Sequence, residues 1–100
     1  MARDLLTVVI AVCNEAQTLP LLQPRLSTVL DLLARQSQVD GQVLYVDDGS
    51  TDDSWRVLQR IAAADARVSL LRLSRNFGKE AALTAGLDLV DTGAALILDA

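Results

Sequence analysis

Two adjacent carboxylates, Asp47 and Asp48, follow an apolar run and stand directly before a glycine and two hydroxyl residues. The run has the character of a strand that is buried on both faces of a parallel sheet. Neighbouring carboxylates repel each other unless a cation or hydrogen-bond donors engage them. Because open α/β sheets bind ligands at the carboxyl ends of their strands, the pair is a candidate binding site. The alternative is a turn at Gly49 followed by a helix cap from Ser50 or Thr51.

Three further apolar runs end in polar residues of the same kinds. The first leads to Asn14 and Glu15, the third to a loop with Arg75 and Lys79, and the last to Asp99. Taken singly, these residues are explained as a helix entry, as solvated loop charges and as a strand terminus. Parallel strands bring their carboxyl ends to one edge of the sheet, however, so we expect four acids and two bases on a single rim. Such a rim suits a diphosphate whose charge is bridged by a divalent cation of the Mg or Mn type.

Four strands and three helices, in strict alternation, are predicted to position these residues. The predicted strands are residues 5–12, 42–47, 68–73 and 94–99, and the predicted helices have apolar stripes over 22–33, about 52–64 and about 79–90. Right-handed crossovers make all four strands parallel and place helices on both faces. The sequence therefore predicts an α/β, Rossmann-like fold in one domain.

Several details of these elements are also predicted. Pro20 suits a first helical turn, whereas Pro24 is expected to kink that helix or delay its start. Residues 36–41 are predicted to form the loop that leaves it. In the third helix the apolar residues at 83, 87 and 90 are expected to face inward, and Gly86 is expected to permit close packing on the sheet.

Composition excludes several classes of protein. The chain is 51% hydrophobic and 22% charged, with mean hydropathy +0.30, as in globular domains. A net charge of −4 without a basic block disfavours a nucleic-acid groove. One cysteine and no histidine exclude a disulfide framework and a cysteine-based zinc site. No signal peptide and no run long enough to span a bilayer occurs in these residues.

Four segments, taken in order, resemble the start of a family 2 glycosyltransferase with the GT-A fold. They are residues 9–15 (VIAVCNE), 46–52 (VDDGSTD), 74–80 (SRNFGKE) and 98–100 (LDA). The branch most resembled is that of the polyprenyl-phosphate sugar transferases, such as dolichyl-phosphate mannose synthase and bactoprenol glucosyltransferases. The resemblance implies that residues 1–100 are a single, incomplete domain, the N-terminal nucleotide-binding half of a GT-A domain.

The resemblance also implies donor-binding positions in three of the segments. These positions are Ala11, Cys13, Asn14, Glu15, Val46, Asp47, Asp48, Asp99 and Ala100. Ala11, Cys13 and Glu15 match residues that line the base and ribose pocket, and Val46 and Asp48 match residues that hold the same groups. Asp99 and Ala100 match the start of a D-x-D motif, in which Asp99 would grip the diphosphate through Mg or Mn. Asp47 is alternatively a support of its own loop.

The chain departs from the family in two respects. The family has proline and tyrosine where Ala11 and Cys13 stand, and loss of the aromatic ring removes a stacking surface for the base worth about 1 kcal/mol. With no histidine or cationic cluster evident beside it, Cys13 is expected to be a small buried apolar residue rather than a nucleophile. The chain also stops inside the motif. The second acid, the catalytic base, the acceptor site and the membrane segments are expected beyond residue 100, so these residues alone are expected to be inactive.

The activity implied by the resemblance is inverting, metal-dependent transfer of a sugar from a UDP or GDP sugar to a polyprenyl phosphate. The whole enzyme would work at the cytoplasmic face of a membrane, in cell wall biogenesis. One alternative is a family 2 enzyme that acts on a polysaccharide or other soluble acceptor. A remote alternative is a receiver-like signalling module phosphorylated on aspartate, but such modules carry their acid pair after the first strand, not the second.

Overall fold

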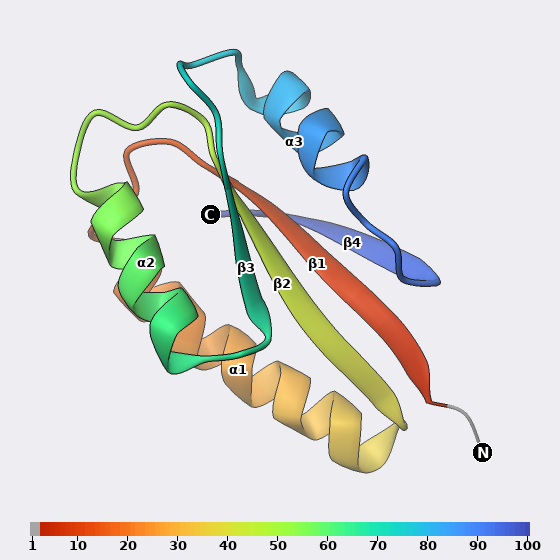
Figure 1. Cartoon of the computed structure of the whole chain (residues 1–100). Coiled ribbons are helices and arrows are strands. Elements are labelled where there is room, and N and C mark those ends of the chain that lie inside the picture. Colours follow the sequence, from red (N-terminus) through yellow and green to blue (C-terminus); the bar gives the residue numbers. More distant parts are fainter. Residues whose placement is uncertain (1–2) are drawn as a thin grey trace.

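The computed structural model describes residues 3–100 and contains the predicted alternation of strands and helices (Figure 1). The elements are β1 (Asp4–Val12), α1 (Leu19–Gln36), β2 (Val39–Asp47), α2 (Ser54–Ala64), β3 (Val68–Arg72), α3 (Lys79–Leu87) and β4 (Ala94–Asp99). Their order and number within the described residues are those that the sequence predicted.

All four strands form one parallel sheet in the order β3-β2-β1-β4. The register aligns the strand ends that carry polar residues: Val12 lies beside Asp47, and Ala11 lies beside Asp99. The carboxyl ends of β1, β2 and β4 therefore meet at one edge. This confirms the predicted α/β, Rossmann-like class.

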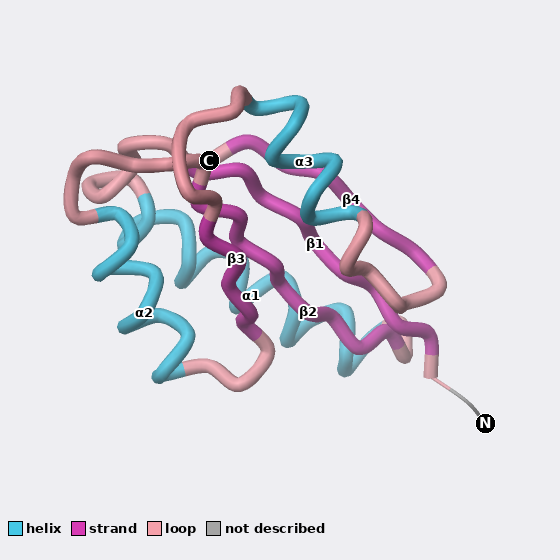
Figure 2. The backbone as a smooth tube through the Cα atoms, turned by 45° about the horizontal axis from the view of Figure 1, so that its top comes forward, coloured by secondary structure: helices cyan, strands magenta, loops and turns pink. Residues whose placement is uncertain are grey.

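Helices cover both faces of the sheet, as predicted (Figure 2). Helices α1 and α2 pack on one face, where alternate residues of β1 such as Val8 and Ile10 are fully or almost fully buried. Helix α3 packs on the other face, against Val9 and Val46. The apolar strands are buried because both faces are covered. The edge strand β4 differs: its Leu96 and Ile97 are each 46% exposed.

The first helix and the second strand differ from their predicted bounds. Helix α1 includes Pro20 in its first turn, as predicted, but continues through Pro24 without a delayed start. Strand β2 begins at Val39, so the predicted loop over 36–41 was wrong. Residues 39–41 are recruited into the sheet because they pair with residues 4–6 of β1, a partner that local sequence does not reveal.

Helix α3 ends at Leu87, and small residues make its contact with the sheet. Ala82 and Gly86 are its buried residues, whereas Leu87 is 38% exposed, so the predicted inward position of Leu87 was wrong. A Cβ atom on Gly86 would lie 2.8 Å from a methyl group of Val9 and of Val46. The predicted role of Gly86 in close packing is thus confirmed.

The single tyrosine offers a test of the core. Tyr45 is 0% exposed and its hydroxyl donates to Gln23 Oε1 at 2.5 Å. Burial, with the negative charge of Asp65 as the smaller cause, raises its pKa from 10.0 to about 12. The raised pKa means that the folded state favours the neutral phenol. This contribution to the free energy of unfolding is fully present below about pH 10 and is lost as the pH rises toward about 12. We expect the phenolate absorbance of the folded chain to titrate with a midpoint near 12.

The unfolded chain in urea is the control, and its midpoint should lie near the ordinary value of about 10. A folded-state midpoint equal to that of the unfolded chain would show that Tyr45 is not buried as described.

Candidate functional site

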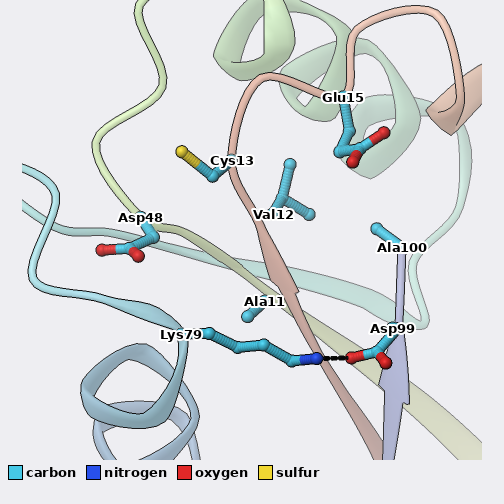
Figure 3. Close-up of a pocket in the computed structure, with 8 residues that line it drawn as sticks. All are labelled: Ala11, Val12, Cys13, Glu15, Asp48, Lys79, Asp99 and Ala100. Atoms are coloured by element: carbon cyan, nitrogen blue, oxygen red, sulfur yellow. Dashed lines mark ion pairs between the residues drawn. The ribbon is translucent and has the colours of Figure 1, made fainter.

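A pocket of about 340 Å³ lies at the carboxyl ends of β1, β2 and β4, beside the start of α3 (Figure 3). It is lined by Ala11, Val12, Cys13, Glu15, Asp48, Lys79, Asp99 and Ala100. Six of the nine predicted donor-binding residues are therefore brought together in one hollow. Asn14, Val46 and Asp47 are the three that do not line it.

The pocket carries three carboxylates and one cation. Glu15, Asp48 and Asp99 come from three different chain segments. Lys79, the first residue of α3, reaches across to form an ion pair with Asp99 on β4 (Figure 3). With one ammonium against three carboxylates, the pocket does not favour a diphosphate unless a further cation accompanies it.

Asn14 holds two loops together rather than lining the pocket. Its backbone has a positive φ of 56°, a conformation that asparagine tolerates better than most residues. Its side-chain Oδ1 accepts hydrogen bonds from the backbone N–H groups of Thr51 at 2.8 Å and Asp52 at 3.2 Å. The loop after β1 is thereby fixed to the loop after β2.

Two serine hydroxyls make the same connection from the opposite side. Ser50 Oγ accepts from the backbone N–H of Asn14 at 2.9 Å, and Ser54 Oγ accepts from that of Glu15 at 2.8 Å. These contacts set the direction in which the chain leaves β1. They therefore position Glu15 at the pocket.

The start of α2 differs from the predicted cap. The helix begins at Ser54, so a cap by Ser50 or Thr51 was wrong. The carboxylate of Asp52 instead accepts from the Ser54 backbone N–H at 2.8 Å. Hydrogen bonding to Ser54, with its side chain as the largest cause, lowers the pKa of Asp52. Ser50 stands four residues before the first residue of the helix, and its hydroxyl accepts from the Asn14 backbone N–H instead.

The two adjacent acids have different surroundings. Asp47 is 0% exposed: its Oδ1 accepts from Ser50 N at 3.2 Å, and its Oδ2 has no hydrogen-bond partner among residues 3–100, with Arg72 Nε 3.9 Å away. Asp48 lines the pocket, and its Oδ1 accepts from the Phe77 backbone N–H at 2.8 Å. Of the two roles considered for Asp47, its contacts favour support of its own loop. Asp48 joins the pocket to the 74–78 loop.

The 74–78 loop is also attached to β1. Asn76 Nδ2 donates to Cys13 Sγ at 3.3 Å, and Asn76 Oδ1 accepts from Gly78 N at 3.0 Å. Cys13 is half-buried and lines the pocket, so the expectation of a buried apolar cysteine was wrong. Cys13 follows the last residue of β1 and borders the pocket at the carboxyl end of that strand.

The remaining predicted residues lie outside the pocket. Val46 is 0% exposed, with its side chain in the core beneath α3. Arg75 lies over the Phe77 ring, with its guanidinium carbon 4.5 Å from the ring centroid, and lines a separate hollow with Arg72 and Ser50. The two bases that the sequence placed on one rim are therefore separated, and only Lys79 enters the pocket.

Two lining residues were absent from the predicted set of nine. Lys79 had a signal, because it follows a strand end and opens a helix. Val12 had none, because an apolar residue near the end of a buried strand resembles every other core residue. Asn76, whose amide donates to Cys13, does not line the pocket. Its place in the loop after the third strand was its only signal in the sequence.

Within residues 3–100 no group of three or more acidic, cysteine or histidine side chains is arranged to hold a metal ion. Mg²⁺ is, however, usually bound by one or two carboxylates together with substrate phosphates. The oxygens of Asp99, whose side chain is 70% exposed, fit that use. The pocket thus suits a cation that Asp99 and a diphosphate hold together. No helix of residues 3–100 has the length and apolar character needed to cross a bilayer.

A parallel α/β sheet with its pocket at the carboxyl ends of the strands is the arrangement of Rossmann-like nucleotide-binding domains. Residues 7–100 match the model of glycosyl transferase family 2, and the chain belongs to this family. This confirms the resemblance carried by the four motifs.

Relatives and solved structures extend the comparison. The chain is 35% identical over 94 residues to the uncharacterized glycosyltransferase YkcC of Bacillus subtilis, covering 94% of the chain and 28% of YkcC. It is 40% identical over 95 residues to the undecaprenyl-phosphate 4-deoxy-4-formamido-L-arabinose transferase of Klebsiella pneumoniae, with the same coverage. The chain thus spans less than a third of the length of these relatives.

Among solved structures, the mannosyltransferase PcManGT of Pyrobaculum calidifontis, in complex with GDP-Man and Mn²⁺, superposes with a TM-score of 0.75. The match has 25% identity and covers 97% of this chain and 27% of PcManGT. TarS of S. aureus superposes with a TM-score of 0.74 at 18% identity, over 94% of this chain and 26% of TarS, and supports the fold alone.

Proposed function

We propose that this chain is the nucleotide-sugar-binding part of an enzyme that transfers a sugar from a nucleotide-diphosphate donor to a polyprenyl phosphate. The observation that carries the proposal is the pocket, because it unites Glu15, Asp48 and Asp99 from three separate chain segments. Membership of glycosyl transferase family 2 supports the transfer reaction. The relative from Klebsiella pneumoniae, named as an undecaprenyl-phosphate transferase, supports the lipid acceptor.

The pocket divides the donor between two groups of residues. Ala11, Cys13, Glu15 and Asp48 receive the base and ribose, and Asp99 and Ala100 face the diphosphate. Asn14 and Asp47 act on the donor through the loops that they hold. Val46 acts through the packing beneath α3, because its side chain is in the core.

Asp99 is proposed as one protein ligand of Mg²⁺ or Mn²⁺, with the donor's phosphates as others. When bound, the cation supplies electrostatic stabilisation of the departing diphosphate. PcManGT, solved with GDP-Man and Mn²⁺, supports a divalent cation.

We propose transfer with inversion, and we assign no catalytic base among residues 3–100. We propose that the reaction takes place at the cytoplasmic face of a membrane, in cell wall biogenesis, with the lipid phosphate as acceptor.

The donor part is tested by calorimetric titration of the chain with UDP and with GDP, each with Mn²⁺ and with EDTA. We expect one of the two nucleotides to bind, more tightly with Mn²⁺, and the corresponding monophosphate to bind more weakly. If neither nucleotide binds under either condition, the proposed donor site is wrong.

The acceptor is tested separately, in membranes from cells that express the whole protein. A radiolabelled nucleotide sugar should place its label on added undecaprenyl phosphate, recovered in the organic phase. Label that appears only on a polysaccharide or other soluble acceptor would favour the alternative family 2 activity.

A further inference from the structure

Lys79 is the only lysine in the chain, whereas eight arginines carry the other side-chain positive charges. Among residues 3–100 it is also the only cation that lines the pocket, beside three carboxylates. Its partner is Asp99, the residue assigned above to the divalent cation. The ammonium and the metal ion would therefore compete for one carboxylate.

The chemistry of lysine suits an exchange of partners. Arginine presents a planar fork that holds a carboxylate in a fixed geometry, whereas lysine is a compact charge on a flexible stem. The ion pair is also exposed, with 56% of the Lys79 side chain and 70% of the Asp99 side chain accessible. Exposed ion pairs contribute little net free energy, so this one is readily opened.

The backbone at Lys79 is held while its side chain stays free to move. Asp48 fixes the loop through the Phe77 N–H, and Asn76 fixes it through Cys13. The stem of Lys79 therefore turns about an anchored position at the start of α3. Lys79 and Asp99 both line the pocket in which the donor's diphosphate is proposed to bind.

We propose that Lys79 is an exchangeable counter-ion: it neutralises Asp99 before the donor binds, yields Asp99 to the divalent cation, and then pairs with the donor's diphosphate. The inference rests on the proposed donor site and assigns to it a sequence of charge exchanges. At each stage the carboxylate of Asp99 has a cation beside it. In the final stage two cations, the divalent ion and the Lys79 ammonium, contact the diphosphate in place of one.

The first experiment uses the single lysine as a reporter. The acylation rate of the Lys79 amine by an amine-reactive ester is followed by peptide mass spectrometry. We expect Mn²⁺ alone to raise this rate roughly threefold, as an opened surface ion pair allows. Addition of Mn²⁺ together with the nucleotide that binds, UDP or GDP, should lower the rate below that of the ligand-free chain. In Asp99→Asn the rate should already be raised, and Mn²⁺ should no longer change it.

The second experiment measures two affinities that should change in opposite directions. Lys79→Met should bind Mn²⁺ alone roughly threefold more tightly, because the competitor for Asp99 is gone. The same variant should bind the nucleotide in saturating Mn²⁺ roughly tenfold more weakly, the loss expected for one charge-assisted contact once the metal holds Asp99. Lys79→Arg should retain nucleotide binding. Arg56→Met, which removes one positive charge from the exposed side of α2, is the matched control and should change neither affinity.

Misfolding cannot produce the expected pattern, because it would weaken both affinities together. The inference is overturned if Mn²⁺ leaves the Lys79 acylation rate unchanged, or if Lys79→Met binds Mn²⁺ no more tightly than the parent chain. If the parent chain binds neither UDP nor GDP, the proposed function fails instead. The Mn²⁺ arm then still decides whether metal displaces Lys79 from Asp99.

Discussion

Replacement of Asp48 by alanine is expected to weaken binding of the nucleotide roughly 10- to 100-fold, the range set by the loss of a hydrogen-bonded charged group. Asp48 lines the pocket, and its Oδ1 accepts from the Phe77 backbone N–H at 2.8 Å. The substitution therefore removes a proposed ribose contact and also releases the 74–78 loop, which leads into Lys79. Calorimetric titration with UDP and GDP in the presence of Mn²⁺ measures the effect.

Asp31→Ala is the control for this substitution. Asp31 lies on α1 with 59% of its side chain exposed, and pairs with Arg67 away from the pocket. Its replacement should leave nucleotide affinity unchanged. Asp48→Asn separates the two roles of Asp48, because asparagine keeps an acceptor for Phe77 N while removing the charge. Equal losses in Asp48→Ala and Asp31→Ala would contradict the proposed pocket.

Replacement of Gly49 by alanine is expected to destabilise the chain by about 2–4 kcal/mol, from a disfavoured backbone conformation and a steric clash together. Gly49 has a φ of +66°, and a Cβ atom there would lie 2.3 Å from the backbone carbon of Arg75 and 2.3 Å from the nitrogen of Asn76. Backbone atoms cannot move aside as the end of a side chain can. The loop after β2 and the loop after β3 would be forced apart, and urea denaturation measures the free energy of unfolding.

Two other glycines separate the causes. Gly78 has a φ of +97° but nothing within 4 Å of the position that an alanine methyl group would occupy, so Gly78→Ala should show the backbone cost of about 1–2 kcal/mol alone. Gly93 has neither feature, and Gly93→Ala should change stability by less than about 0.5 kcal/mol. A Gly49→Ala chain as stable as Gly93→Ala would show that the two loops do not touch.

Local patterns determined much of the fold. Continuous apolar runs identified the strands, and in β1 and β2 the reason is that a strand covered on both faces needs apolar residues at nearly every position. The run in β4 is equally apolar, although Leu96 and Ile97 of that edge strand are exposed. The alternation of strands with helical stripes dictated a parallel sheet, since parallel strands need crossover connections. The same logic placed Glu15, Asp48 and Asp99 at one edge, and they do line one pocket. The motifs at the four strand ends identified the family.

The contacts between those strand ends came only from the tertiary structure. The order β3-β2-β1-β4 brings Asp99 beside Ala11, and no local pattern states which strands are neighbours. The hydroxyls of Ser50 and Ser54 accept hydrogen bonds from backbone N–H groups more than 35 residues away in the chain. Arg75 packs on the Phe77 ring, whereas Lys79 pairs with Asp99. Residue type sets what each side chain can bind, and burial and strand register decide which partner it meets. Hydrogen bonds and ion pairs form between groups that packing makes adjacent, and adjacency is a property of the whole chain.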